Sequence, residues 1–460
     1  MGLILKDSQY IEGIASNWET QKDIRNYLQT IDKLKKSIKD KEVQSISLND
    51  GLLKEIDKEI IWYSYDSSNR ATFFTSHYIG YYSSIGENEE VNIEIKPRFG
   101  EGVLNYLLSY AYGIYLPKSD SSVSSSNSKN NTLWLITVMW KAMLEKAITK
   151  SQIPKEYKAY EQNSSRFRGQ LQISKHIKNN LVDKSKFYCK YRKLTMDTTI
   201  NQTIRYTYNL LVKKEKGLKS LLKDIAEYDN MLHSFGVQHR KISTFDIKNI
   251  RYSKLNIYYK KVMELSALII KSQSINNDSK SLNREGFSYF IDIAELWENY
   301  LLKLLQKHLP QYNIYSPNEK GGEYLLENSF REIRPDIIIE QDGEIVAILD
   351  AKYKWYNKIG KYASNYGAVS RDDLYQMSSY LYHYSREDKP IVGLFISPIG
   401  GDEDLNILSH NDKHQMGVVN LNIEQFTQDS DEDFQKFSRE SIEEEERKFI
   451  SKIPLAIVNK

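Results

Sequence analysis

The chain has 460 residues, 40% of them apolar, which is enough for two or three domains with cores of their own. Its 64 Lys and Arg residues against 61 Asp and Glu give a net charge of only +3, which excludes a molecule that attracts nucleic acid over its whole surface. The single cysteine, Cys189, excludes an intramolecular disulfide and a cysteine-based zinc cluster. The opening MGLILKDSQY has no secretory signal pattern and no apolar run reaches about 18 residues, so we expect a cytoplasmic protein without membrane contact.

The first half of the chain predicts strands followed by helices. Residues 59–99 alternate in polarity and are rich in aromatic side chains, which predicts a small antiparallel sheet. Residues 132–150 and 196–235 have helical spacing. The segment 116–132 between them is rich in Ser and Asn and has little to bury, so we expect an exposed insertion there. We therefore predict one β-then-α region over 59–271.

The second half begins after another polar segment, 272–286, which we predict to be a linker. Residues 287–309 (FSYFIDIAELWENYLLKLLQKHL) then predict a helix in which Glu298 shares an apolar face with Leu301 and Leu305. A carboxylate on such a face is costly unless a cation meets it, so we expect a positive charge beside Glu298. The acidic end of the chain, 427–460, predicts a solvated helix or a mobile tail.

Between these helical segments, RPDIIIEQDGEIVAILDAKYKWY (334–356) predicts a β-hairpin. An Asp-Gly pair between two apolar runs favours a type I′ turn, because both central residues must adopt positive φ. If the strands pair without interruption, Asp336 lies opposite Leu349 and beside Asp350. Both acids then meet at the open end of the hairpin.

The residues at that open end suggest a metal site. Asp350 and Lys352 point to the same side of their strand, since side chains alternate along a strand. Two carboxylates held close together repel each other, and a divalent cation keeps both ionised. Oxygen ligands favour Mg²⁺ or Mn²⁺ over zinc. A lysine beside such an ion can orient a water and stabilise the charge on a scissile phosphate, so the pattern suggests phosphodiester hydrolysis.

These residues resemble the PD-(D/E)XK nuclease superfamily, with Glu298 on a first helix, Pro335-Asp336 on one strand and Asp350-Ala351-Lys352 on the next. The stretch SRDDLYQMSSYLYHYS resembles the second helix, with a capping box formed by Ser370 and Asp373. The resemblance implies a central mixed sheet flanked by helices over residues 287–426. It also implies site roles, which are catalytic for Glu298, Asp336, Asp350, Lys352 and Gln376, metal-binding for Glu298, Asp336, Asp350 and Ala351, and DNA-binding for Tyr380.

A set of cations follows the Asp-Ala-Lys strand directly. Lysines interleaved with an aromatic residue suit a phosphate backbone beside the site, although a solvated strand end explains them nearly as well. The predicted DNA-binding residues are Lys354, Trp355, Lys358 and Lys361.

The resemblance extends to the McrC family, the nuclease subunit of modification-dependent restriction systems. The N-terminal half is similar to that family in YIGYYSSIGENEEVNIEIKPRFG (78–100), although Lys96-Pro97-Arg98 stands where the family has Pro-Lys. Further similar stretches are SSRFRGQLQISKHI (164–177) and YRKLTMDTTINQTIRY (191–206), followed in the family's order by ELWENYL, RPD, LDAKYK and DLYQMSSY. The N-terminal extension, 1–58, has no counterpart that we can place.

The McrC resemblance implies a division of labour. The chain has no G-x-x-x-x-G-K-[ST] loop, so we expect it to bind no nucleotide itself. The family implies a McrB-type AAA+ GTPase hexamer as the motor that reads modified double-stranded DNA, with region 59–271 docking in its pore. Candidate contacts with this partner or with DNA are Arg166, Arg168 and Gly169, for which an exposed basic turn is the alternative. The resemblance also allows a homodimer of this chain.

Three functions fit these observations. The chain is the active nuclease subunit of a two-component system, a stand-alone magnesium nuclease, or a catalytically idle regulator of an AAA+ motor. The intact acids Glu298, Asp336 and Asp350, together with Lys352, argue against the idle regulator. A neighbouring gene for a DNA-reading GTPase would argue against the stand-alone nuclease.

Overall fold

The computed structural model describes most of the chain. The described residues are 2–8, 10–11, 21–41, 43, 45–46, 53–56, 59–65, 71–85, 90–112, 128–214, 216–277, 288–317, 323–325, 332–354, 369–385, 389–398, 406–409, 413–423, 426 and 439–458. They form two compact units, unit 1 of Met1–Leu116 with Arg284–Lys460 and unit 2 of Pro117–Asn283. Within these ranges no helix has the length and apolar character needed to cross a bilayer.

The first sheet of unit 1 joins strands from both ends of that unit. Its strand order is β1-β8-β7-β12-β3-β4, and a smaller sheet with order β2-β6-β5 accompanies it. Gly80 in β7 has φ of +153°, and a Cβ there would lie 2.1 Å from the carbonyl oxygen of Tyr289 in β12, so only glycine permits this close strand approach. The strands are β1 (Gly2–Lys6), β2 (Tyr10–Ile11), β3 (Ser45–Ile46), β4 (Leu53–Lys54), β5 (Ile61–Tyr65), β6 (Ala71–Thr75), β7 (Tyr78–Ile85), β8 (Glu90–Lys96) and β12 (Ser288–Asp292).

Three strands among the described residues before position 59, β1, β3 and β4, belong to this sheet, which corrects the prediction of a separate extension. β1 pairs in parallel with β8, so the sheet is also not purely antiparallel. Helix α1 (Gln21–Lys39) packs on β7 and β8 and buries Ile31 and Leu34 in the same core as Leu3 and Leu5. The pairing of β1 could not be predicted from the sequence, because its partners in β8 lie about ninety residues away and leave no local pattern.

The predicted helix at 287–309 begins later than expected. Residues 288–292 form β12, which pairs antiparallel with β7, and α10 (Ile293–His308) starts only at Ile293. Tyr289, Phe290 and Ile291 are all buried in the sheet, and aromatic and β-branched side chains favour that environment. Asp292 then caps α10, because its side chain accepts hydrogen bonds from the backbone N–H groups of Ala294 and Glu295.

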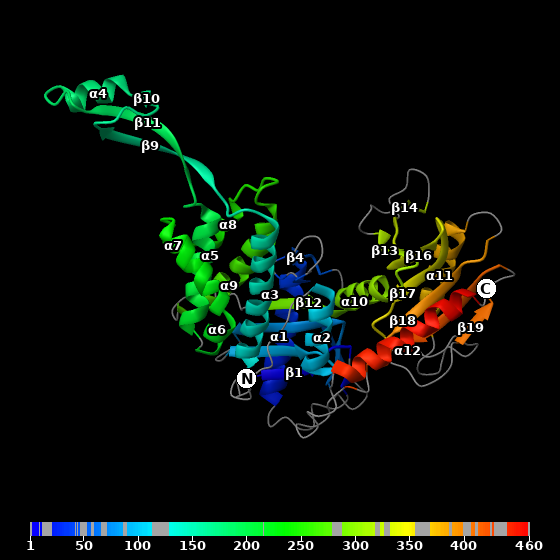
Figure 1. The fold of residues 1–460 in the computed structure, drawn as a ribbon. Helices are drawn as coiled ribbons and strands as arrows, with labels where there is room; N and C mark the ends of the chain where they lie inside the picture. Colours follow the sequence, from blue (N-terminus) through cyan, green and yellow to red (C-terminus); the bar gives the residue numbers. More distant parts are fainter. Residues whose placement is uncertain are drawn as a thin grey trace. The chain divides into compact units, whose positions relative to one another are not determined.

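The second sheet of unit 1 has the order β13-β16-β17-β18-β20-β19. It is mixed, because β17 with β18 and β18 with β20 are parallel while the other pairs are antiparallel. Helices flank it, since α10 packs on β13 and β17, α11 on β17 and β18, and α12 on β20 (Figure 1). The elements are β13 (Asn313–Tyr315), β14 (Glu323–Tyr324), β15 (Glu332–Ile333), β16 (Ile337–Gln341), β17 (Glu344–Ala351), β18 (Val392–Ser397), β19 (Asn406–Ser409), β20 (Gln415–Asn420), α11 (Arg371–Tyr384) and α12 (Arg439–Val458).

The acidic C-terminal region is a packed helix over its described part, which corrects the expectation of a solvated tail. Helix α12 buries Ile442, Phe449 and Ile453. Its Glu446 is also buried and accepts hydrogen bonds from the hydroxyl groups of Tyr106 in α2 (Gly100–Tyr112) and Tyr300 in α10. Apolar residues at helical spacing between the acids pack into the core and hold the helix there. Most of its acidic side chains face away from that core, but Glu446 does not.

Unit 2 consists of a helical bundle and a projecting finger. Region 196–235 is helical as predicted but is divided among three helices. The finger, residues 156–195, is a three-stranded sheet with the order β10-β11-β9 and one short helix, and it projects away from the bundle (Figure 1). The elements are α3 (Ser128–Lys150), β9 (Glu156–Ser164), β10 (Gln170–Leu171), α4 (Ile173–Asn180), β11 (Phe187–Thr195), α5 (Thr199–Lys214), α6 (Lys216–Leu221), α7 (Lys223–Ser234), α8 (Thr244–Lys248), η2 (Ile257–Tyr259) and α9 (Lys260–Asn277).

The division of the chain therefore differs from the predicted one. The later boundary of unit 2, at Asn283, falls in the predicted linker 272–286, but the earlier boundary falls at Leu116 inside the predicted region 59–271. The strands before that point pair with β12, which lies beyond the finger in the sequence. Unit 2 is thus an insertion within unit 1.

Candidate active site

The β16–β17 hairpin turns where the sequence predicts. Asp342 and Gly343 have φ of 53° and 83°, and Gln341 pairs with Glu344 across them. Positive φ at both central residues is the type I′ geometry, whose twist matches that of the two strands. The predicted Asp-Gly turn is confirmed.

A β-bulge decides which residues meet at the open end of the hairpin. The ladder keeps the predicted register next to the turn and then shifts by one residue midway along β16. An uninterrupted hairpin places Leu349 opposite Asp336, but in the structure Leu349 pairs with Ile337. The prediction was wrong by one residue, because a bulge adds a residue to one strand only. The next position outward brings Asp336 directly to Asp350.

The two acids share a buried, hydrogen-bonded environment. The backbone N–H of Ala351 donates to Oδ2 of Asp336 at 2.7 Å, and the negative charge of Asp350 acts on the carboxyl group of Asp336. Burial, followed by the negative charges of Glu298 and Asp350, raises the pKa of Asp336 well above its ordinary value. The neighbouring carboxylates thus oppose ionisation of Asp336.

Lys352 lies between two carboxylates. Its Nζ is 2.8 Å from Oδ2 of Asp350 and 3.1 Å from Oδ1 of Asp373. It also donates to Oε1 of Gln376 at 3.1 Å. Burial acts to lower the pKa of Lys352, but Asp350 and Asp373 outweigh it and raise the pKa above its ordinary value. The ammonium group is therefore charged at neutral pH and fixed in position.

Helix α11 supplies the other wall of the site. Ser370 caps the helix by accepting from the N–H of Asp373, and its hydroxyl donates to the Asp373 carboxylate at 2.5 Å. One turn on, Nε2 of Gln376 donates to the Tyr380 hydroxyl at 2.6 Å, and that hydroxyl donates to the carbonyl oxygen of Arg334 at 3.0 Å. The helix thus holds the strand that leads into Asp336.

Two assignments on α11 change with the structure. Asp373 was predicted only as part of a helix cap, but its carboxylate is also a partner of Lys352. Its three-residue spacing before Gln376 places the two on one helix face, which is the signal that could have found it. Tyr380 is 6% exposed and packs in the core, so it supports the site from within and is not available as the expected DNA contact.

The three predicted acidic ligands do not form one cluster. In the part of the chain that the structure describes, no three His, Cys, Asp or Glu side chains are grouped so that they could hold a metal ion. Glu298 is half-buried on α10, and its charge acts on Asp336, but it does not join the acidic pair in one ligand set. Asp336 and Asp350 still fit a hard divalent cation, because the half-buried carboxyl group of Asp336 and the buried one of Asp350 offer the oxygen donors such ions prefer.

Known proteins share this sequence pattern. A family model described as the McrBC 5-methylcytosine restriction system component matches residues 74–395, more than half of the chain. The chain belongs to this family. The Type IV methyl-directed restriction enzyme EcoKMcrBC of Escherichia coli (strain K12) is 24% identical over 310 residues, which are 64% of this chain and 84% of that protein.

Solved structures extend the likeness of this McrBC component to its fold. A chain of the refined half-complex from the tetradecameric assembly of Thermococcus gammatolerans McrB AAA+ hexamers with bound McrC matches with a TM-score of 0.58 and 17% identity, over 98% of this chain and 100% of that chain. The cryo-EM structure of the Thermococcus gammatolerans McrBC complex matches with a TM-score of 0.37 and 18% identity, over 68% and 89% of the two chains, which is too low to support an argument. The predicted McrC resemblance and the mixed α/β fold class are confirmed.

The predicted contact residues of this McrBC component lie on the finger. Arg166 and Arg168 are exposed in the loop between β9 and β10. Gly169 has a different task, because its φ is +67° and a Cβ there would lie 2.5 Å from the carbonyl oxygen of Lys190. Only glycine lets the loop close onto β11, so Gly169 shapes the finger and offers no side chain for contact.

The finger concentrates positive charge. Residues 156–195 contain ten Lys and Arg against three Asp and Glu, so this segment carries +7 whereas the whole chain carries +3. Large apolar side chains are exposed on it as well, including Phe167 at 58%, Ile173 at 65% and Val182 at 95%. The net positive charge of the finger therefore exceeds that of the whole chain, and its surface combines the charge and apolar area of an interaction surface.

The Thr-x-Asp-x-x-x-Asn stretch of this McrBC component holds the root of the finger. The Asn201 side chain donates to the carbonyl oxygens of Pro154 and Met196, one on each leg of the finger, at 2.9 and 2.7 Å. Asp197 accepts from the backbone N–H of Gln238 at 2.9 Å and so ties one leg to the bundle. These contacts explain the motif as a structural clamp.

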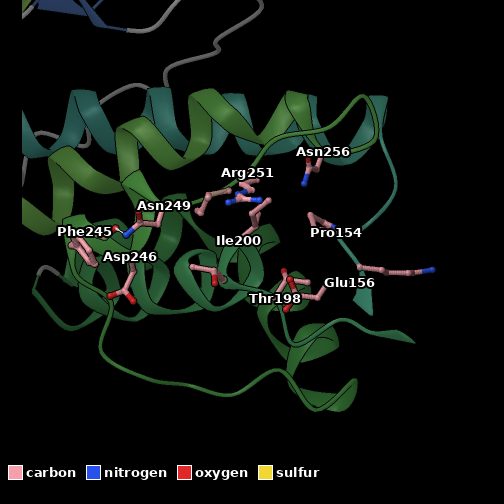
Figure 2. Close-up of a pocket in the computed structure, with 12 residues that line it drawn as sticks. Pro154, Glu156, Thr198, Ile200, Phe245, Asp246, Asn249, Arg251 and Asn256 are labelled. Carbon is pink, nitrogen blue, oxygen red and sulfur yellow. Dashed lines mark hydrogen bonds between the residues drawn. The ribbon is translucent and has the colours of Figure 1, made fainter. Parts of the chain in front are cut away.

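A pocket of about 470 Å³ opens beside this clamp in unit 2 (Figure 2). Its walls come from the finger root, the start of α5 and α8, and they include Glu156 and Asp246. Asp246 is already engaged in the capping box with Ser243 and in an ion pair with Arg240. The pocket contains none of the predicted catalytic residues, so it is not the candidate active site.

The remaining DNA-binding predictions fall mainly outside the described residues. Lys354 is exposed, and its Nζ lies 3.5 Å from Oδ2 of Asp373. The same carboxylate contacts Lys352, so Lys354 lies next to the candidate active site. Trp355, Lys358 and Lys361 lie outside the described residues.

Proposed function

We propose that this McrBC component is a metal-dependent endodeoxyribonuclease that hydrolyses phosphodiester bonds in modified foreign DNA. The observation that carries the proposal is the convergence of Asp336, Asp350 and Lys352 at the open end of the β16–β17 hairpin, in the order and spacing of the PD-(D/E)XK pattern. The proposal agrees with the family, whose members are restriction system components.

In this proposal, Asp336 and Asp350, with Ala351 beside Asp350, would hold Mg²⁺ or Mn²⁺. A bound ion would supply charge neutralisation at the scissile phosphate and a lowered pKa for a water. Lys352 orients the attacking water and stabilises the negative charge that develops on the phosphate. Asp373 and Gln376 keep the ammonium group in place, since each contacts Nζ within 3.1 Å. Lys354 is exposed beside them, where it can contact a phosphate of the backbone.

The proposed partner is a McrB-type AAA+ GTPase hexamer that translocates the DNA. The finger supports this, because it combines a charge of +7 with exposed apolar side chains on a narrow projection. The solved chain with the same fold comes from an assembly of McrB AAA+ hexamers with bound McrC. The chain itself has no P-loop sequence, so GTP hydrolysis is assigned to the partner.

The first prediction tests the site in the reconstituted system. Asp350→Ala and Lys352→Ala should each reduce cleavage of modified DNA by at least about a thousandfold, because the ion or the charged ammonium is lost. Both variants should still stimulate the GTPase activity of the motor. Lys303→Ala, which removes an exposed lysine from α10, is the control and should cut like the wild type.

Two outcomes would contradict the proposal. If Asp350→Ala cleaves DNA at the wild-type rate, Asp350 is not part of the active site and the proposed site is wrong. Efficient cleavage by the wild-type chain without motor or GTP would favour a stand-alone nuclease.

A further inference from the structure

The backbone directly after β17 is held from two directions. On one side the neighbouring strand β18 holds it, since the N–H of Lys352 donates to the carbonyl oxygen of Ile396 at 2.9 Å and Ser397 donates to that of Lys354 at 2.6 Å. On the other side Nη2 of Arg98 donates to the carbonyl oxygen of Tyr353 at 3.1 Å. Arg98 follows β8 of the first sheet of unit 1. The hydrogen bond from Arg98 to Tyr353 therefore comes from outside the sheet that carries the site.

Arg98 also contacts the side chain of Tyr353. Its guanidinium carbon lies 4.2 Å from the centroid of the Tyr353 ring and 4.7 Å from that of Phe99. The two rings meet edge to face with centroids 5.7 Å apart. Tyr353 is 5% exposed, so these cation–π contacts are shielded from water and correspondingly strong. The arginine thus holds both the backbone and the side chain of the residue that follows Lys352.

Asp7 fixes Arg98 in turn. It is fully buried and accepts from the backbone N–H of Arg98 at 2.5 Å, and its Oδ2 lies 3.9 Å from Nε of the same arginine. Asp7 follows β1 and Arg98 follows β8, and these strands are parallel neighbours. Their carboxyl ends therefore lie at one edge of the sheet, and that edge meets the end of β17.

We infer that Arg98 is a positioning residue for the nuclease site, acting through Tyr353 on the placement of the Lys352 ammonium group. The inference rests on the proposed function, in which Lys352 acts on the water and the phosphate. It also accounts for the Lys96-Pro97-Arg98 stretch, where a lysine was expected in place of the arginine. A planar guanidinium can donate to a carbonyl in its own plane while its flat face lies against a ring, whereas an ammonium group is a compact charge without such a face.

The first test compares kinetic constants in the full chain with its motor. Arg98→Ala should lower kcat for cleavage by about ten- to a hundredfold with little change in KM for DNA, since a displaced catalytic group costs rate more than binding. Arg98→Lys should recover only part of the rate. The control Arg25→Ala removes an exposed arginine from α1 and should have no effect.

Two further readouts separate positioning from general damage. Added guanidinium ion should restore part of the activity of Arg98→Ala and none of that of Lys352→Ala. In the metal-free protein, amide hydrogen exchange should accelerate in Arg98→Ala at residues 352–354 and stay unchanged in the β16–β17 turn.

The outcomes distinguish the inference from the proposed function. Full activity of Arg98→Ala, or exchange that accelerates throughout unit 1, overturns the positioning role. If Lys352→Ala itself cuts normally, the proposed function fails first and the inference fails with it. If Lys352→Ala is inactive while Arg98→Ala has the wild-type kcat, only the inference fails.

Discussion

At the scale of single residues, Asp336 is the group whose ionisation depends most on what binds beside it. Its pKa is raised by burial and by the charges of Glu298 and Asp350. A carboxyl group with a raised folded-state pKa adds stability below its unfolded pKa, and this contribution is lost as the pH rises through the folded value. At neutral pH the metal-free site is therefore a source of instability, and a cation that binds the carboxylates removes it.

The second prediction follows from this linkage. At pH 7, Mg²⁺ or Mn²⁺ should raise the melting temperature of the wild type, because an ion that binds only the folded state stabilises it. Asp336→Asn should show a much smaller shift, since one of the two carboxylates is gone. In EDTA the variant should melt higher than the wild type at neutral pH. Calorimetry with and without the ion measures both effects, and equal metal-induced shifts in the two proteins would contradict a shared site.

Asp7 supplies a third prediction, away from the metal. Burial raises the pKa of Asp7 from 3.8 to about 6, against the opposing charge of Arg98. The associated stability is present below about pH 4 and is lost as the pH rises through 6, which amounts to about 3 kcal/mol for two units. Asp7→Asn should therefore flatten the fall in unfolding free energy between about pH 4 and pH 7. Denaturant titrations of both proteins across this range give the comparison, and parallel curves would exclude a raised pKa.

At the scale of elements, the turn of the β16–β17 hairpin could be predicted from the sequence, but the pairing register of its two strands could not. The Asp-Gly turn needs only the conformational preferences of its own two residues, so the sequence predicts it correctly. The bulge lies where the partner of Glu340 is Ile345 and that of Ile339 is Ala347, and nothing in the residues there marks it. Asp336, Asp350 and Lys352 could be predicted as a group because they sit on one hairpin, whereas Arg98 reaches the same place from another sheet.

The buried Glu446 explains why the acidic helix α12 packs. The hydroxyl groups of Tyr106 and Tyr300 donate to its Oε1 at 2.6 and 2.7 Å. Burial raises the pKa of Glu446, and the two hydroxyl groups act in the opposite direction by hydrogen-bonding to the carboxylate. The network joins α2, α10 and α12, so it ties the C-terminal helix to both sequence segments of unit 1.

The fourth prediction removes one bond of this network. Tyr300→Phe should lower the free energy of unfolding by about 1.5–3 kcal/mol, because the lost bond is to an ionisable group in the interior. Tyr110→Phe is a matched control, since the Tyr110 hydroxyl is buried and has no hydrogen-bond partner among the described residues. It should leave stability unchanged or raise it slightly. Equal losses in the two variants would show that ring packing, and not the hydrogen bond, stabilises α12.

At the scale of the whole molecule, the insertion of unit 2 into unit 1 determines which truncations preserve a fold. Removing residues 1–271, a division suggested by the predicted linker, would strip β7 from β12 and expose Phe290, which is fully buried. The sequence could not reveal this, because pairing between strands about two hundred residues apart leaves no mark on either one. Similarity to a known family predicted the overall fold, whereas the division of the chain into two nested units is visible only in the structure.

The fifth prediction uses that division. A chain in which residues 1–116 are joined to 284–460 by a short flexible linker should unfold cooperatively and bind Mg²⁺ like the full protein, because each sheet of unit 1 is complete without the finger. It should neither stimulate the motor nor cut DNA in a GTP-dependent way. Circular dichroism melts and GTPase assays check both halves of the expectation. A molten product from this chain would show that unit 1 needs unit 2 to fold.

The nested order of the two units also sets a timetable for the nascent chain. The ribosome delivers residues in sequence, and β12, which lies between β7 and β3, emerges only after all of unit 2 has been synthesised. The N-terminal strands must wait for it, while the finger and its bundle can fold as soon as they appear. The Asp-Ala-Lys strand emerges later still. Each newly made molecule thus acquires its basic finger before its candidate active site.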